Sequence, residues 1–66
     1  MNVHDLLAQA IAAHRSGQIA RAVAGYQAVL AQDACVTPAL TNLGSILRQH
    51  GFLDEAIALL QRAVAL

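Results

Sequence analysis

The sequence repeats itself at an interval of 34 residues, the separation of Leu6 from Leu40 and of Gly17 from Gly51. Further identical pairs at this interval are Ala22 with Ala56, Ala24 with Ala58, Gln27 with Gln61, and Ala31 with Ala65. An internal period of about 20–50 residues is typical of architectures in which similar units stack side by side. The chain is therefore expected to consist of two similar units.

Each unit is predicted to be a pair of helices. The composition is 58% hydrophobic but only 3% aromatic, and the apolar content is mostly Ala and Leu, which favours helix over sheet. Gly17 and Gly51 each follow one apolar helical pattern and precede another, as expected where a helix ends and the chain turns back. The prediction is an all-α fold of four antiparallel helices, over about residues 3–15, 18–32, 38–50 and 53–66.

Three of the predicted helices begin with recognisable signals. Asn2 can cap the first helix, and Thr37 followed by Pro38 is a start signal for the third, with Thr as the cap and Pro at the first helical position. Asp54 and Glu55 place two acidic residues near the positive end of the fourth helix dipole. The chain is thus expected to be a single domain, residues 1–66, with repeat one over about 3–36 and repeat two over about 37–66.

These residues resemble the tetratricopeptide repeat family. The resemblance covers nearly the whole chain and is carried in repeat one by Ala10, Gly17, Ala22 and Tyr26, and in repeat two by Ala39-Leu40-Thr41-Asn42-Leu43-Gly44, Gly51, Glu55-Ala56-Ile57 and Ala63. It implies an α-solenoid of two helix-turn-helix repeats. Small residues at positions 10, 22, 44 and 56 also have a physical reason, because larger side chains would separate helices that cross closely there.

The charges and motifs exclude several classes of function. Four Arg balance four acidic residues, so no basic excess is available for nucleic acid or for an anionic membrane surface. The sequence has no nucleophile elbow, phosphate loop or zinc-binding His pair, and we expect no enzyme, metal or cofactor. The lone Cys35 fits a reducing compartment, so a cytoplasmic protein is expected; this thiol is either a small loop residue or a cross-link between two chains on oxidation.

In tetratricopeptide arrays the first helix of each repeat lines a concave groove, and the resemblance therefore implies a peptide-binding surface here. A groove of this kind suits an extended peptide or an amphipathic helix; the alternative is that its apolar residues only pack against a neighbouring helix. The groove residues implied by the resemblance are Leu7, Ile11, His14, Thr41, Asn42, Ser45, Arg48 and Gln49.

The last helix is predicted to self-associate. Leu53, Ile57, Leu60 and Val64 are expected to face the hairpin partner, leaving Leu59, Ala63 and Leu66 as a second apolar side. A helix that is apolar around most of its circumference is normally buried on more than one face, and a chain of this size usually needs an additional source of stability. A homodimer or higher oligomer is expected, formed either by end-to-end stacking or by exchange of a hairpin across the connection 33–37.

Two functions follow from this interpretation. The first is a protein interaction module that binds a peptide or an amphipathic helix and also self-associates. The alternative is the N-terminal, substrate-positioning segment of a larger enzyme, because Asn42-Leu43-Gly44 is similar to repeats of O-linked N-acetylglucosamine transferases. In such arrays an Asn at this place holds peptide backbone, which a side-chain amide can do because it both donates and accepts hydrogen bonds.

Overall fold

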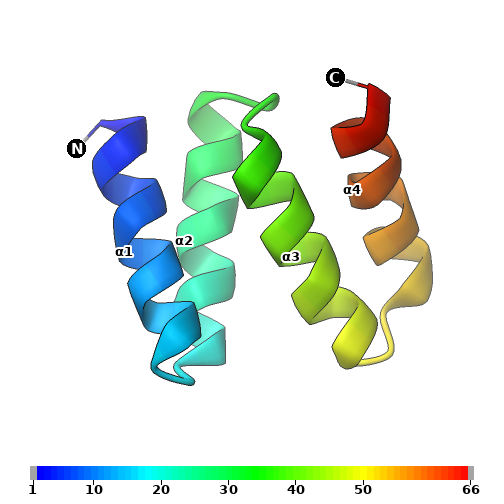
Figure 1. Ribbon diagram of the computed structural model, residues 1–66, viewed down its shortest axis with the longest axis horizontal. Helices are drawn as coiled ribbons and strands as arrows, with labels where there is room; N and C mark the ends of the chain where they lie inside the picture. The colour runs from blue at the N-terminus through cyan, green and yellow to red at the C-terminus, as the bar shows by residue number, and fades with distance from the viewer. Residues whose placement is uncertain (1, 66) are drawn as a thin grey trace.

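The structure is all-α, as predicted. A computed structural model describes residues 2–65, which form α1 (Val3–Arg15), α2 (Ile19–Gln32), α3 (Thr37–Gln49) and α4 (Leu53–Ala65). The helices make two antiparallel hairpins, α1–α2 and α3–α4, and α2 packs against α3 between them (Figure 1). The predicted helix boundaries agree with the observed ones to within a residue.

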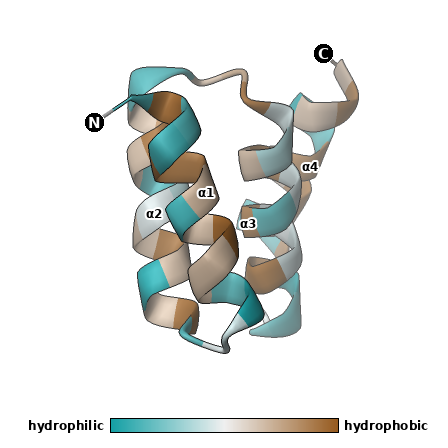
Figure 2. Cartoon of the chain, turned by 60° about the vertical axis from the view of Figure 1, so that its left-hand side comes forward, coloured by the Kyte–Doolittle hydropathy of each residue, from teal (hydrophilic) through white to brown (hydrophobic). Residues whose placement is uncertain are grey.

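Two layers of helices lie face to face. In Figure 2, α1 passes in front of α2 and α3 in front of α4. The Cα atoms span 29 × 25 × 14 Å, and the shortest dimension matches two helices packed about 8–10 Å apart with Cα radii of about 2.3 Å. The molecule is therefore a slab one pair of helices thick, and most helices keep one face in water.

The helix starts agree with the sequence at α1 and differ at α3. Asn2 caps α1, because its Oδ1 accepts a hydrogen bond of 2.8 Å from the amide of Asp5. The predicted cap of α3 is wrong: Thr37 is already helical, Val36 occupies the cap position, and no side chain caps this end. Pro38 has no amide hydrogen to satisfy, so a start with fewer capping bonds is tolerated.

Both hairpin turns use the same arrangement of backbone hydrogen bonds. Gly17 and Gly51 have φ angles of +80° and +88°, a conformation that costs glycine little because it has no Cβ. The amide of Gly17 donates to the carbonyl of His14 at 3.1 Å, and Gln18 donates to Ala13 at 2.9 Å. In the second turn Gly51 donates to Arg48 and Phe52 to Leu47 in the same pattern, the Schellman motif.

The two helices of each hairpin approach closely at small residues. A Cβ added to Gly25 would lie 2.7 Å from the Cβ of Ala10, so α1 and α2 touch almost backbone to backbone. In the second hairpin a Cβ on Gly44 would lie 2.9 Å from the end of the Leu60 side chain. The expected close crossings at Ala10 and Gly44 are thus present, whereas the role of Gly25 was not predicted.

The core combines alanines with aliphatic residues and one tyrosine. Tyr26 is fully buried in a cluster that extends over α1, α2 and α3. The other buried members of this cluster are Ala10, Ala13, Ala22, Val29, Ala39, Leu43 and Ile46, and Leu40 of α3 is also fully buried.

The connection between the hairpins is held by side chains. The carboxylate of Asp33 accepts a hydrogen bond of 3.0 Å from the amide of Cys35, a local turn that stabilises a chain reversal. The guanidinium of Arg62 on α4 donates to the carbonyl of Ala34 at 2.8 Å. The C-terminal helix is therefore attached to the connection between the two hairpins.

The orientation predicted for α4 is wrong. Leu53, Ile57 and Val64 are 55%, 51% and 87% exposed, so most of the stripe expected to face α3 lies in water. The side turned inward instead carries Ala56, which is buried, and Leu59, Leu60 and Ala63, which are half-buried. The Leu60 side chain packs on Gly44, and this contact fixes the rotation of α4 about its axis.

We predict that Gly25→Ala lowers the free energy of unfolding by about 1–2 kcal/mol, although alanine favours helix by about 1 kcal/mol. The new methyl meets the rigid Cβ of Ala10, which cannot move without displacing α1. Gly44→Ala is the matched comparison and should cost less than Gly25→Ala, because the new methyl meets Cγ and Cδ2 of the Leu60 side chain, which can shift by a change of rotamer, whereas the Cβ of Ala10 is fixed to its backbone. Urea unfolding followed by circular dichroism measures both variants.

A double-mutant cycle with Ala10→Gly isolates this contact. Ala10→Gly should lower the free energy of unfolding less in the Gly25→Ala background than in the natural chain, and the coupling energy between the two positions should be about 1 kcal/mol. A stabilising effect of Gly25→Ala, or a coupling of zero, would contradict the close crossing.

Candidate functional site

The face formed by α1 and α3 contains the predicted groove residues. Leu7 and Ile11 of α1 are half-buried and pack against the core cluster. Their outer parts reach the surface, so they combine an internal packing role with an apolar strip open to a ligand. The alternative that the apolar groove residues pack against a neighbouring helix is thus met in part.

A buried tyrosine connects the helices beneath this face. The hydroxyl of Tyr26 on α2 lies 3.2 Å from Nδ1 of His14 on α1, and the two rings meet edge to face with centroids 6.0 Å apart. Tyr26 also forms a side-chain hydrogen bond with Asn42 on α3. A buried tyrosine needs a partner for its hydroxyl, and here that requirement joins three helices.

The environment of the hydroxyl favours its protonated form. Burial raises the pKa of Tyr26 above its ordinary value of 10.0, because the phenolate would lose its hydration. The hydrogen bond from Asn42 and the positive charge of Arg15 oppose this rise and only reduce it. Tyr26 is thus a neutral hydrogen-bonding group near neutral pH.

The structure brings two predicted groove residues together and leaves others separate. His14 and Asn42 are half-buried and meet at Tyr26. Ser45 is half-buried, while Thr41, Arg48 and Gln49 are exposed. The face therefore combines apolar groups from α1 with polar groups from α3.

Sequence reasoning missed the role of Tyr26 in this site. Tyr26 was named only as part of the resemblance and His14 only as a groove residue, and the two were not linked. At the end of α1 the hydroxyl of Ser16 donates to the carbonyls of Ala12 and Ala13, at 3.1 Å from both. The available signal was that Tyr26 is the single tyrosine of the chain in an alanine-rich helix, where a hydroxyl must find a polar partner.

The residues predicted for self-association lie mostly on the inner side of α4. Leu59 and Ala63 are half-buried, and Leu59 packs against the core cluster. Leu66 lies outside the described residues. The exposed apolar surface of α4 instead includes Leu53, Ile57 and Val64.

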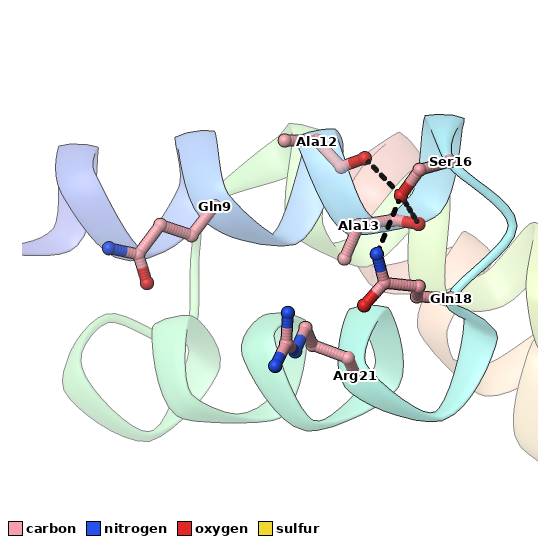
Figure 3. A pocket seen from close by; sticks show the side chains of 6 residues that line it. All are labelled: Gln9, Ala12, Ala13, Ser16, Gln18 and Arg21. Atoms are coloured by element: carbon pink, nitrogen blue, oxygen red, sulfur yellow. Dashed lines mark hydrogen bonds between the residues drawn. The ribbon is translucent and has the colours of Figure 1, made fainter.

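A polar hollow lies between α1 and α2 on another side of the molecule. In Figure 3, Gln9 of α1 and Arg21 of α2 lie on opposite walls of this hollow, and Gln18 lies beside Ser16 at one end. The Nε2 of Gln18 donates to the hydroxyl of Ser16 at 3.1 Å. Ala12 and Ala13 complete the lining, so the hollow combines polar and apolar groups.

Within residues 2–65 no group of three or more His, Cys, Asp or Glu is placed to hold a metal ion. Over the same residues, none of the four helices has the length and apolar character needed to cross a membrane.

Comparison with known proteins returned no match. No model of a known family matches the chain, and the searches matched no curated protein and no solved structure.

We predict that Tyr26→Phe lowers the free energy of unfolding by about 1–2 kcal/mol, because His14 and Asn42 lose a shared partner in a half-buried site. Thermal unfolding at neutral pH measures the difference. Phe keeps the ring, so a loss near that of a cavity mutation, about 3–5 kcal/mol, would contradict a hydrogen-bonding role.

The raised pKa of Tyr26 also predicts a pH dependence. The unfolded chain releases the phenolic proton near pH 10.0 and the folded chain only above it. The contribution of the protonated Tyr26 to the free energy of unfolding is therefore complete below pH 10 and is lost as the pH rises through the raised pKa. Tyrosinate absorbance reports the ionisation of Tyr26 alone, because the chain has one tyrosine. In Tyr26→Phe the loss of stability above pH 10 should be absent.

Proposed function

We propose that the chain is a two-repeat solenoid of the tetratricopeptide type that binds another protein and has no catalytic role. The observation that supports this most directly is the identity of the two hairpin turns. Gly17 and Gly51, 34 residues apart, end α1 and α3 with positive φ and the same pair of backbone hydrogen bonds. Two units of the same design, stacked through α2 and α3, are what a short solenoid requires.

The ligand proposed for the α1–α3 face is an extended peptide or an amphipathic helix. Leu7 and Ile11 would receive its apolar side chains, and the exposed Thr41 and Arg48 would contact its polar groups. The Asn42 amide has four hydrogen-bonding positions, so it can serve Tyr26 and still pair with a peptide backbone.

Rigidity of the face supports this proposal. His14 on α1 and Asn42 on α3 are both fixed by the hydroxyl of Tyr26, so the two helices that line the face are held at a set distance. A preformed surface binds with less loss of conformational entropy than a mobile one.

We predict that peptides selected from a displayed random library bind the natural chain and lose at least about tenfold in affinity with Ala8→Arg. Ala8 is exposed on α1 beside Leu7 and holds the place equivalent to Asn42 of repeat two. An arginine there would obstruct the face without removing a core contact. Fluorescence anisotropy with the selected peptides measures the affinity.

The matched control is Ala24→Arg, the same substitution at an exposed alanine of α2. It should leave the affinity unchanged. Failure to select any peptide, or equal losses in both variants, would remove the α1–α3 face as a binding site.

A further inference from the structure

The hydroxyl of Tyr26 has two partners and only one proton to give them. It lies 3.2 Å from Nδ1 of His14 and forms a hydrogen bond with the side-chain amide of Asn42. A hydroxyl donates one hydrogen bond, whereas it can accept two. The directions of the two bonds are therefore linked: when one partner accepts the proton, the other has to donate, or a hydrogen bond in a buried place is left unmade.

The bond with Asn42 is directed toward the tyrosine oxygen. It opposes the rise in the pKa of Tyr26 that burial causes, and a hydrogen bond lowers the pKa of a phenol by donating to the charged oxygen. Nδ2–H of Asn42 therefore donates to Tyr26, and the hydroxyl proton is directed to Nδ1 of His14. Because Nδ1 accepts, the ring proton of neutral His14 is on Nε2. We call this chain of three side chains the relay.

The unused atoms at both ends of the relay reach the surface. Over residues 2–65, no polar side-chain atom of a buried or half-buried residue is both shielded from water and unpaired. His14 and Asn42 are half-buried, and no bond within the described residues uses Nε2 of His14 or Oδ1 of Asn42. These two atoms are therefore open to a ligand, one as a donor and the other as an acceptor.

Protonation of His14 reverses both bonds at Tyr26. A protonated imidazole has a hydrogen on each nitrogen and accepts no hydrogen bond. Nδ1–H then donates to the tyrosine oxygen, and the hydroxyl proton has to turn to Asn42. The Asn42 amide can receive this proton only with its oxygen. Half a turn about χ2, a torsion with two similar orientations, brings Oδ1 to Tyr26 and leaves Nδ2–H at the surface.

We propose that the hydroxyl of Tyr26 is a positioning group that couples the protonation of His14 to the orientation of the Asn42 amide. With neutral His14 the α1–α3 face offers a hydrogen-bond acceptor at Asn42, and with protonated His14 it offers a donor at the same place. His14 presents Nε2–H in both states, so the change at the surface is confined to Asn42.

The other charged groups around the relay are arginines. Arg15 of α1 acts on Tyr26 through its positive charge, and Arg48 of α3 is exposed on the same face. The charged residue of α2 is Arg21, which lines the hollow between α1 and α2. Arginine stays protonated in proteins, whereas the charge of a histidine ordinarily changes between about pH 5 and about pH 8. A response of the relay in this range is therefore assigned to His14.

The consequence for a ligand rests on the peptide-binding function proposed above. A peptide N–H that donates to Oδ1 of Asn42 would face another donor after protonation of His14, and neither N–H would be paired. Peptides selected at about pH 8 that contact Asn42 should lose about tenfold in affinity at about pH 5, and His14→Gln should abolish this loss. Failure to obtain any peptide would count against the binding function, whereas the relay is tested without a ligand.

Nuclear magnetic resonance of the isotopically labelled natural chain tests the relay directly. At about pH 8 the ring of His14 should carry its proton on Nε2, and a nuclear Overhauser effect should connect the Nδ2 protons of Asn42 with the Tyr26 ring. Titration to about pH 5 should protonate both ring nitrogens and weaken this connection several-fold, because the amide turns its Nδ2 away. A proton on Nδ1 at the higher pH, or an unchanged connection at the lower pH, would overturn the proposal.

Two variants separate the relay from a general effect of pH. Tyr26→Phe keeps the ring and removes the hydroxyl, so the Asn42 amide should no longer respond to the titration. His14→Gln removes the titrating group without touching the buried ring and should also abolish the response. The matched controls are His4→Gln and His50→Gln, which replace exposed histidines and should leave it intact. A response that persists in either of the first two variants, or is lost in either control, would overturn the proposal.

Discussion

The close approach of α1 and α2 at Ala10 and Gly25 sets the character of the whole structure. With no room for another carbon between them, these helices interact through methyl groups and backbone, and dispersion contacts at such short range are numerous although individually weak. In the second hairpin a Cβ on Gly44 would meet Cγ and Cδ2 of Leu60 at 2.9 Å and the backbone oxygen of Ala56 at 3.5 Å. The two hairpins therefore share a close crossing at a glycine but differ in which atoms fill it.

Tyr26 is the largest of the fully buried side chains, ahead of Leu40 and Ile46. Unlike those aliphatic residues, a tyrosine brings a hydroxyl into the core, where it needs a partner. His14 and Asn42 satisfy that hydroxyl from two other helices. Burying the Tyr26 ring therefore also connects α1, α2 and α3 through polar groups. This connection lies directly under the face proposed to bind a peptide.

The last helix is outside this network, and the two ends of the slab differ as a result. Among its described residues α4 buries only Ala56 fully, and it is attached by contacts with α3 and by the bond from Arg62 to Ala34. The α1 end exposes Asp5 and Gln9, while the α4 end exposes aliphatic side chains.

The amino-acid sequence was sufficient for the parts of the fold that depend on neighbours along the chain. Gly17, Gly51 and Asn2 act through hydrogen bonds to residues a few positions away, so their roles can be read locally. The rotation of α4 could not be read in this way, because aliphatic residues occur on both sides of the helix and periodicity alone does not choose between Leu59 and Ile57. Gly44 has no side chain, and Leu60 occupies the space that this leaves, which sets the rotation of α4. The partner of His14 was likewise decided by which helix lay beside it. Both features depend on distances between segments that are far apart in sequence, and these distances exist only after the hairpins have packed.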